Sequence, residues 1–163
     1  MLIYFLYITC ENVYRLSSFY DSHLKLIQDT NMELHTAFIH AHDDSRFYYN
    51  IREVKPTIVK IFSLKGSKTL EYEKISSKLK FKEDSEDGAQ EFMIKFTPEG
   101  GFKLYQDGSC LTLVESSDLS MKPCSSEKKQ VFMILTGDNS AIIKPFGEMT
   151  YTYEYTVIPD NHE

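Results

Sequence analysis

Tryptophan is absent from this 163-residue chain, so an aromatic surface that stacks on a ligand must be built from tyrosine, phenylalanine or histidine. The 7 Gly and 5 Pro are too few for a collagen-like or low-complexity chain. Basic residues are also scarce, with 18 Lys and Arg against 24 Asp and Glu. The resulting net charge of −6 argues against nucleic acid and anionic lipid surfaces as partners. The length and composition are those of one packed globular domain.

The apolar run at residues 1–10, MLIYFLYITC, is much shorter than the roughly 20 residues that span a bilayer. Its length suits the apolar region of a signal peptide, although no Lys or Arg precedes it and Ile8 stands where a small residue usually precedes cleavage. The alternative is a buried first strand in a cytosolic protein. We expect residues 1–10 to be a candidate signal peptide and residues 11–163 to form one domain of a secreted or extracellular protein.

The chain has only 3 cysteines, Cys10, Cys110 and Cys124. If Cys10 leaves with a signal peptide, the other two form an even set that can pair. Such a pair would stabilise the fold by roughly 3 kcal/mol in the chain-entropy model. This requires strands that bring the two Cα atoms within bonding range.

Enzyme signatures are missing from the sequence. It has no Gly-x-Ser-x-Gly motif, no glycine-rich phosphate loop, and no Cys and His arrangement with an evident third partner. No zinc-type spacing accompanies His40, His42, Asp43 and Asp44, so we interpret this segment, with His35 nearby, as a polar loop. We expect a protein that is not an enzyme and that holds no cofactor and no metal.

Beyond residue 12, apolar and polar residues alternate in short runs, which is the pattern of half-buried β-strands. The clearest runs are residues 59–62, 79–81, 102–105, 110–113 and 150–155. Turn-forming residues separate the runs at 87–88, 98–101, 107–108 and 137–139. Since no segment holds a sustained apolar stripe with helical spacing, we expect an all-β domain.

Four landmarks recur three times in the same order, at intervals of 40 to 47 residues. The first landmark is an apolar-basic-apolar triplet at residues 14–16, 59–61 and 102–104, and the second is a leucine, Leu24, Leu70 and Leu111. The third is another triplet at residues 32–34, 79–81 and 119–121, and the fourth is an aromatic residue, Phe47, Phe92 and Phe132. Three units of four strands predict a β-trefoil, a closed barrel capped by three hairpins. A β-sandwich is the alternative, because regularly spaced strands align with one another in any all-β chain. Residues 140–145 and 149–158 suffice for two further strands that three units do not use.

Residues 108–132, GSCLTLVESSDLSMKPCSSEKKQVF, carry a more specific pattern. Cys-Leu is followed by an apolar strand, Pro-Cys and Gln130-Val131-Phe132, an order that resembles a unit of the ricin B-type lectin family, with Phe in place of the family's Trp. Gln90-Glu91-Phe92 gives a second copy, and the first unit keeps only Ser45-Arg46-Phe47. The resemblance implies a Cys110–Cys124 disulfide and supports secretion.

Sugar binding in that family uses an Asp just after Cys-Leu, an aromatic residue just before Pro-Cys, and polar residues near the Gln-x-Trp element. The third unit has Thr112 and Lys122 at the first two places, so it lacks both the acceptor and the platform. The middle unit keeps a carboxylate, Glu71, but has Lys82 in place of the aromatic residue.

The first unit has Lys25 at the carboxylate place and His35 as a weak aromatic platform. We therefore expect at most one retained sugar site, formed by Glu71 and Gln90 or by His35. The alternative is that Gln90 and Gln130 only fix turns of the scaffold.

The patterns and the resemblance together imply a secreted ricin B-like β-trefoil that binds a glycan or glycoprotein at most at one retained site, without a membrane span and without nucleic acid. A second interpretation is a protein-interaction trefoil, inhibitor-like or cytokine-like, that acts through its loops. Tyr151, Tyr153 and Tyr155 share one face of a predicted strand and would offer such a surface to a protein partner.

Overall fold

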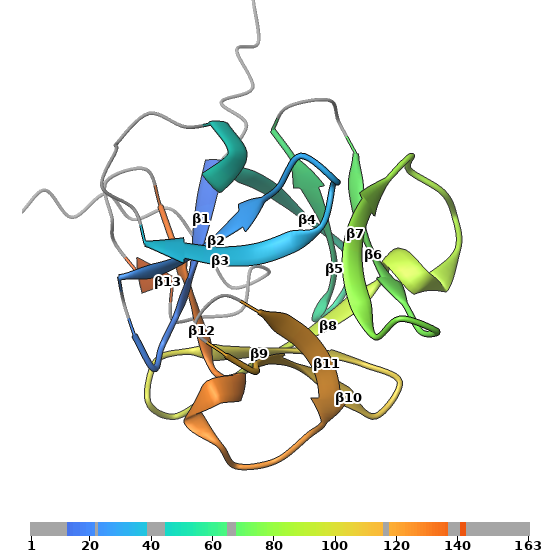
Figure 1. The fold of residues 1–163 in the computed structure, drawn as a ribbon. Coiled ribbons are helices and arrows are strands. Elements are labelled where there is room, and N and C mark those ends of the chain that lie inside the picture. The colour runs from blue at the N-terminus through green and yellow to red at the C-terminus, as the bar shows by residue number, and fades with distance from the viewer. Residues whose placement is uncertain are drawn as a thin grey trace, which may run out of the picture.

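The computed structural model describes residues 13–21, 23–38, 45–64, 68–115, 118–136 and 141–142, which form three units of four strands (Figure 1). The first unit comprises β1 (Val13–Ser18), β2 (Leu24–Gln28), β3 (Leu34–Phe38), the 3-10 turn η1 (Ser45–Phe47) and β4 (Tyr49–Lys55). The second comprises β5 (Ile58–Ser63), β6 (Thr69–Glu73), β7 (Lys78–Lys82), η2 (Gly88–Gln90) and β8 (Phe92–Phe96). The third comprises β9 (Phe102–Gln106), β10 (Ser109–Leu113), β11 (Leu119–Pro123), η3 (Lys128–Gln130) and β12 (Phe132–Leu135). A short further strand, β13 (Ala141–Ile142), pairs with β12.

Six strands close a barrel. Antiparallel pairing runs through β1, β4, β5, β8, β9 and β12 and then returns to β1, so each of these strands has a neighbour on both sides. The strands β2–β3, β6–β7 and β10–β11 form three hairpins. In Figure 1 these hairpins lie toward the top, the right and the bottom of the view, respectively. This closed pairing is that of a β-trefoil and excludes the β-sandwich, in which two separate sheets face each other.

The predicted triplets take equivalent places in the barrel. Within each unit the first strand pairs with the last through the same register, Tyr14 with Tyr49, Val59 with Phe92, and Phe102 with Phe132. Two residues further along the first strands lie Leu16, Ile61 and Leu104, all almost fully buried. The apolar residues of the three triplets therefore face the core, as expected for strands with alternating apolar and polar residues.

The aromatic landmark of the first unit needs correction. Phe47 ends η1, the place that Gln90 and Gln130 take at the ends of η2 and η3. Tyr49, the fully buried first residue of β4, is the counterpart of Phe92 and Phe132, which begin β8 and β12. The sequence holds three aromatic residues at positions 47–49, and the Gln-x-Phe spacing, applied from Phe47, would have selected Tyr49.

The hairpin landmarks of the first unit are displaced by two residues. In the second and third hairpins, Leu70 pairs with Phe81 and Leu111 pairs with Met121. The equivalent buried pair of the first hairpin is Leu26 with Thr36, whereas the prediction placed Leu24 there. A slip of two residues leaves the inward and outward alternation unchanged, so hydrophobic patterning cannot detect it.

The β9–β10 connection shows how turn residues fix such a register. Gln106 pairs with Ser109 across a two-residue turn, in which Asp107 and Gly108 have φ of 48° and 81°. Positive φ at both central positions is the geometry of the type I′ turn that suits a right-twisted hairpin. Asp-Gly was expected to form a turn at this place, and the structure confirms it.

The candidate signal peptide, residues 1–10, and the predicted strand at 149–158 lie outside the described residues. Within the described ranges no helix is long and apolar enough to cross a membrane. The described core is formed by aliphatic and aromatic side chains from all three units. Cys110 is also buried but lies outside this cluster.

Candidate functional site

Gln90 is a fully buried side chain that joins its turn to the neighbouring hairpin. Its Nε2 donates to the backbone oxygen of Glu83 at 2.8 Å and to Glu71 Oε2 at 3.2 Å. Its Oε1 accepts from the backbone N–H of Ser85 at 2.9 Å. The amide group is therefore engaged on both sides by the protein itself.

Gln130 repeats this arrangement in the third unit. Its Nε2 donates to the backbone oxygen of Pro123 at 2.9 Å and to Thr112 Oγ1 at 3.1 Å, and its Oε1 accepts from Ser125 N at 2.7 Å. The same three kinds of partner in two units identify the Gln-x-Phe element as a tie between the 3-10 turn and its hairpin. This supports the interpretation that both glutamines fix turns.

Gln90→Ala is expected to lower the free energy of unfolding by about 1–3 kcal/mol, because the Ser85 N–H and the Glu83 carbonyl lose a fully buried hydrogen-bond partner. Urea unfolding would measure the change. Glu86→Gln alters an exposed side chain of the same loop and should stay within about 0.5 kcal/mol of the parent. A Gln90 variant as stable as this control would show that the amide is not a structural tie.

None of the three family-type sugar positions, all among the described residues, combines an aromatic platform with a carboxylate. In the third unit Thr112 Oγ1 donates to the backbone oxygen of Cys110 at 2.9 Å and also accepts from Gln130. After correction of the register, the first unit has Ile27 and Ala37 at the two places that the prediction gave to Lys25 and His35. Apolar side chains there supply no acceptor for a sugar hydroxyl.

Glu71, in the middle unit, is brought together with Gln90 as expected, but Lys82 also binds it. Lys82 Nζ lies 2.7 Å from Glu71 Oε1, and Gln90 Nε2 lies 3.2 Å from Oε2, so each carboxylate oxygen has a partner. The hydrogen bond that Lys82 donates to Glu71 raises the pKa of Lys82. A lysine thus occupies the place of the stacking residue and neutralises the one retained carboxylate.

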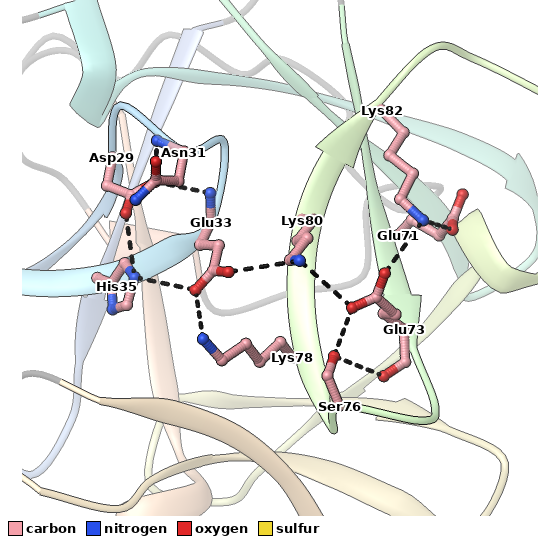
Figure 2. A network of polar contacts seen from close by, with 10 residues as sticks. All are labelled: Asp29, Asn31, Glu33, His35, Glu71, Glu73, Ser76, Lys78, Lys80 and Lys82. Atoms are coloured by element: carbon pink, nitrogen blue, oxygen red, sulfur yellow. Dashed lines mark hydrogen bonds and ion pairs between the residues drawn. The ribbon is translucent and has the colours of Figure 1, made fainter.

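The Glu71–Lys82 pair is one end of a charged network that crosses β6, β7 and the start of β3 (Figure 2). Lys82 Nζ also lies 3.6 Å from Glu73 Oε1. Lys80 Nζ lies 3.4 Å from Glu73 Oε2 and 3.4 Å from Glu33 Oε1. The lysines come from β7, and their carboxylate partners come from β6 on one side and from Glu33, just before β3, on the other. Lateral pairing of this kind stabilises adjacent strands by tenths of a kcal/mol per pair.

The other end of the network joins the first and second hairpins. Lys78 Nζ lies 2.7 Å from Glu33 Oε2, and Ser76 Oγ donates to Glu73 Oε2 at 2.6 Å (Figure 2). The hydrogen bond from Lys78 lowers the pKa of Glu33, and the hydrogen bonds from Ser76 and then Lys80 lower that of Glu73. Both carboxylates are therefore held in the charged form that pairs with the lysines.

His35, the alternative to Glu71 and Gln90 in the prediction, lies in this network and lines a hollow of about 270 Å³. Its Nε2 is 3.3 Å from Asp29 Oδ2 and 3.5 Å from Glu33 Oε2, and its Nδ1 is 3.8 Å from Asp118 Oδ1. The imidazole ring, a half-buried group, thus faces carboxylates from the first and third units. Among the described residues there is no set of three His, Cys, Asp or Glu side chains arranged to hold a metal ion, and His40, His42, Asp43 and Asp44 lie outside them.

The two cysteines of the third unit are joined by a disulfide. Cys110 lies on β10, Cys124 follows β11, and their Cα atoms are 5.0 Å apart. The prediction from the family resemblance is confirmed. The bond closes the open end of the β10–β11 hairpin, opposite its turn.

Exposed aromatic side chains away from the family positions were missed by the sequence analysis. Tyr20, in the turn between β1 and β2, is 62% exposed, and Phe38, at the end of β3, is 56% exposed. Both line a hollow of about 260 Å³ between the first and third units. The one signal in the sequence is the placement of Tyr20 beside a turn-forming Asp21, which is weak because exposed single aromatics are common.

No family model matches the chain, and no curated protein matches it in sequence. Among solved structures it is similar to the designed threefold-symmetric protein ThreeFoil, with 14% identity and a TM-score of 0.65 over 75% of this chain and 96% of that one. A Polyporus squamosus lectin bound to a human-type influenza-binding epitope gives 11% identity and a TM-score of 0.68, over 77% of this chain and 49% of that one. The BEL β-trefoil gives 13% identity and a TM-score of 0.64, over 77% and 92%. Likeness at these identities shows the β-trefoil fold.

Proposed function

We propose that this chain is a carbohydrate-binding β-trefoil module of ricin B type, which acts by binding and not by catalysis. The observation that carries the proposal is the repeated glutamine tie: Gln90 and Gln130 hold their turns against their hairpins through equivalent hydrogen bonds. The Gln-x-Phe element is one of the features by which the third unit resembles the lectin family. The solved structures that it resembles include a lectin bound to a glycan epitope.

Secretion belongs to the same proposal. The Cys110–Cys124 disulfide is of a kind that persists in oxidising compartments, which include the cell exterior. A glycan or glycoprotein at a cell surface is therefore the expected partner. The formal charge of −6 favours a neutral or weakly charged glycan over a polyanionic one.

An array of immobilised glycans tests the proposal. The full chain, oxidised and shown to be folded by circular dichroism, is expected to bind at least one defined glycan saturably. The same sample unfolded in urea and then reduced serves as the control and should bind none. No saturable binding by the folded, oxidised protein would contradict carbohydrate binding as its function.

One observation favours the second interpretation, a protein-interaction trefoil. Ile75, at the tip of the turn between β6 and β7, is fully exposed to solvent. An apolar side chain at a loop tip is a common anchor in protein interfaces. The predicted tyrosine strand, Tyr151, Tyr153 and Tyr155, lies outside the described residues, so its surface remains a prediction.

A further inference from the structure

We propose that the glycan binds in the hollow between the first and third units, against the aromatic rings of Tyr20 and Phe38, and not at the family-type positions. This inference rests on the proposed function and assigns it a site. The hollow has about 260 Å³, slightly below the roughly 300–1,000 Å³ of pockets for drug-sized ligands. A volume of this size suits a short terminal part of a glycan.

Exposed apolar side chains concentrate at this hollow. The described residues include six large apolar side chains that are exposed, and three of them, Tyr20, Phe38 and Val114, line it. Single exposed apolar residues are ordinary, whereas several around one concave place mark a binding site. Two of the three are aromatic, and in a chain without tryptophan a sugar ring can stack only on tyrosine, phenylalanine or histidine.

Hydrogen bonds hold the backbone that carries the two aromatic residues. The buried hydroxyl of Ser18 accepts the backbone N–H of Tyr20 at 3.1 Å and that of Asp21 at 3.3 Å. The turn is closed by the backbone N–H of Leu24, which donates to the backbone oxygen of Asp21 at 3.0 Å. Phe38 pairs with Leu24 across the β2–β3 hairpin. The turn that carries Tyr20 leads into β2, and β3, which carries Phe38, pairs with β2, so an ordered backbone presents both residues and lowers the entropic cost of binding.

Polar groups at the rim supply the hydrogen bonds that a sugar needs. Asp21 lines the hollow from the first unit, and Glu115 and Lys129 line it from the third. Two carboxylates accept from hydroxyl groups and an ammonium group donates to them, while the aromatic faces cover the apolar C–H face of the ring. At the family-type position of the middle unit, in contrast, Lys82 and Gln90 already engage both oxygens of Glu71.

The test compares single variants of the full chain on the glycan that the parent binds most strongly on the array, by isothermal titration calorimetry. Tyr20→Ala and Phe38→Ala are each expected to weaken binding about tenfold or more, the equivalent of one lost aromatic contact with its buried area. Tyr20→Phe and Phe38→Tyr keep the ring and should bind within about threefold of the parent. Ile75→Ala, which removes an exposed apolar side chain elsewhere, is the matched control.

Asp21→Asn and Glu71→Ala separate this site from the family-type one. The asparagine oxygen can still accept the backbone N–H of His23, which Asp21 Oδ1 binds at 2.9 Å, so the turn should remain intact while glycan binding weakens. Glu71→Ala should leave glycan binding unchanged. Thermal unfolding monitored by circular dichroism verifies that every variant is folded.

The outcomes distinguish the site from the function. Loss of binding in Tyr20→Ala and Phe38→Ala, with Glu71→Ala unaffected, supports the hollow as the glycan site. If both aromatic variants still bind the glycan, this site is overturned, whatever the result for Glu71→Ala. The proposal of carbohydrate binding is unaffected by that outcome. A folded parent protein that binds no glycan overturns both.

Discussion

Phe132→Ala is expected to lower the free energy of unfolding by about 3–5 kcal/mol, because it removes a fully buried ring and leaves a cavity that the barrel cannot fill. The ring packs against Phe102, with 6.3 Å between centroids, where the first and last strands of the third unit meet. Urea unfolding followed by circular dichroism measures the loss. The milder Phe132→Leu variant gives a measurable value if the alanine variant does not fold.

Tyr49→Ala and Phe47→Ala form a matched comparison of stability, because the structure and the sequence pattern assign different residues, Tyr49 and Phe47, to the same position of the repeat. Tyr49 is fully buried and stacks on Phe81 at 5.8 Å between centroids, and its burial raises the pKa of its hydroxyl. Phe47 is buried but is not part of the central core cluster. Tyr49→Ala should therefore approach the cost of Phe132→Ala, and Phe47→Ala should cost less. The reverse order would restore Phe47 as the counterpart of Phe132.

The barrel could be predicted from the sequence because its signals are local. Alternation within runs such as residues 59–62 marks the strands, and Asp107-Gly108 marks a turn whose backbone angles few other residue pairs adopt. The register error in the first unit arose where these local signals do not distinguish two alignments. Placing Leu24 instead of Leu26 in the repeat keeps the same face buried, so only the hairpin pairing reveals the shift.

The site was less predictable because its neighbours are distant in the sequence. Glu33 meets Lys78 from another unit, 45 residues away, and that contact belongs to the same network in which Lys82 neutralises Glu71. The Tyr20–Phe38 hollow likewise needs Val114 from the third unit to form its far wall. Neither arrangement follows from composition, spacing or the family resemblance, since each depends on how the units are packed around the barrel.

Removing the Cys110–Cys124 disulfide is expected to lower the free energy of unfolding by about 3 kcal/mol, the chain-entropy value for a loop of this size, since the cysteines are 14 residues apart. Cys110→Ala/Cys124→Ala is the variant, and the parent protein reduced with dithiothreitol is the second form to measure. Urea unfolding of both, beside the oxidised parent, gives the loss. A double variant as stable as the oxidised parent would contradict this role of the bond.

The middle unit offers the control, because a polar tie replaces the disulfide at the equivalent place. Thr69 Oγ1 donates to Asp84 Oδ1 at 3.2 Å, and Lys60 Nζ lies 2.8 Å from the same oxygen and lowers the pKa of that carboxyl. Asp84 is half exposed, so Asp84→Ala should cost less than about 1 kcal/mol. A polar tie is formed and lost with the fold, whereas the disulfide also restricts the unfolded chain. The opposite outcome is that Asp84→Ala lowers the free energy of unfolding as much as loss of the disulfide does. That result would show that native contacts at this position determine the stability of the hairpin, and that restriction of the unfolded chain does not.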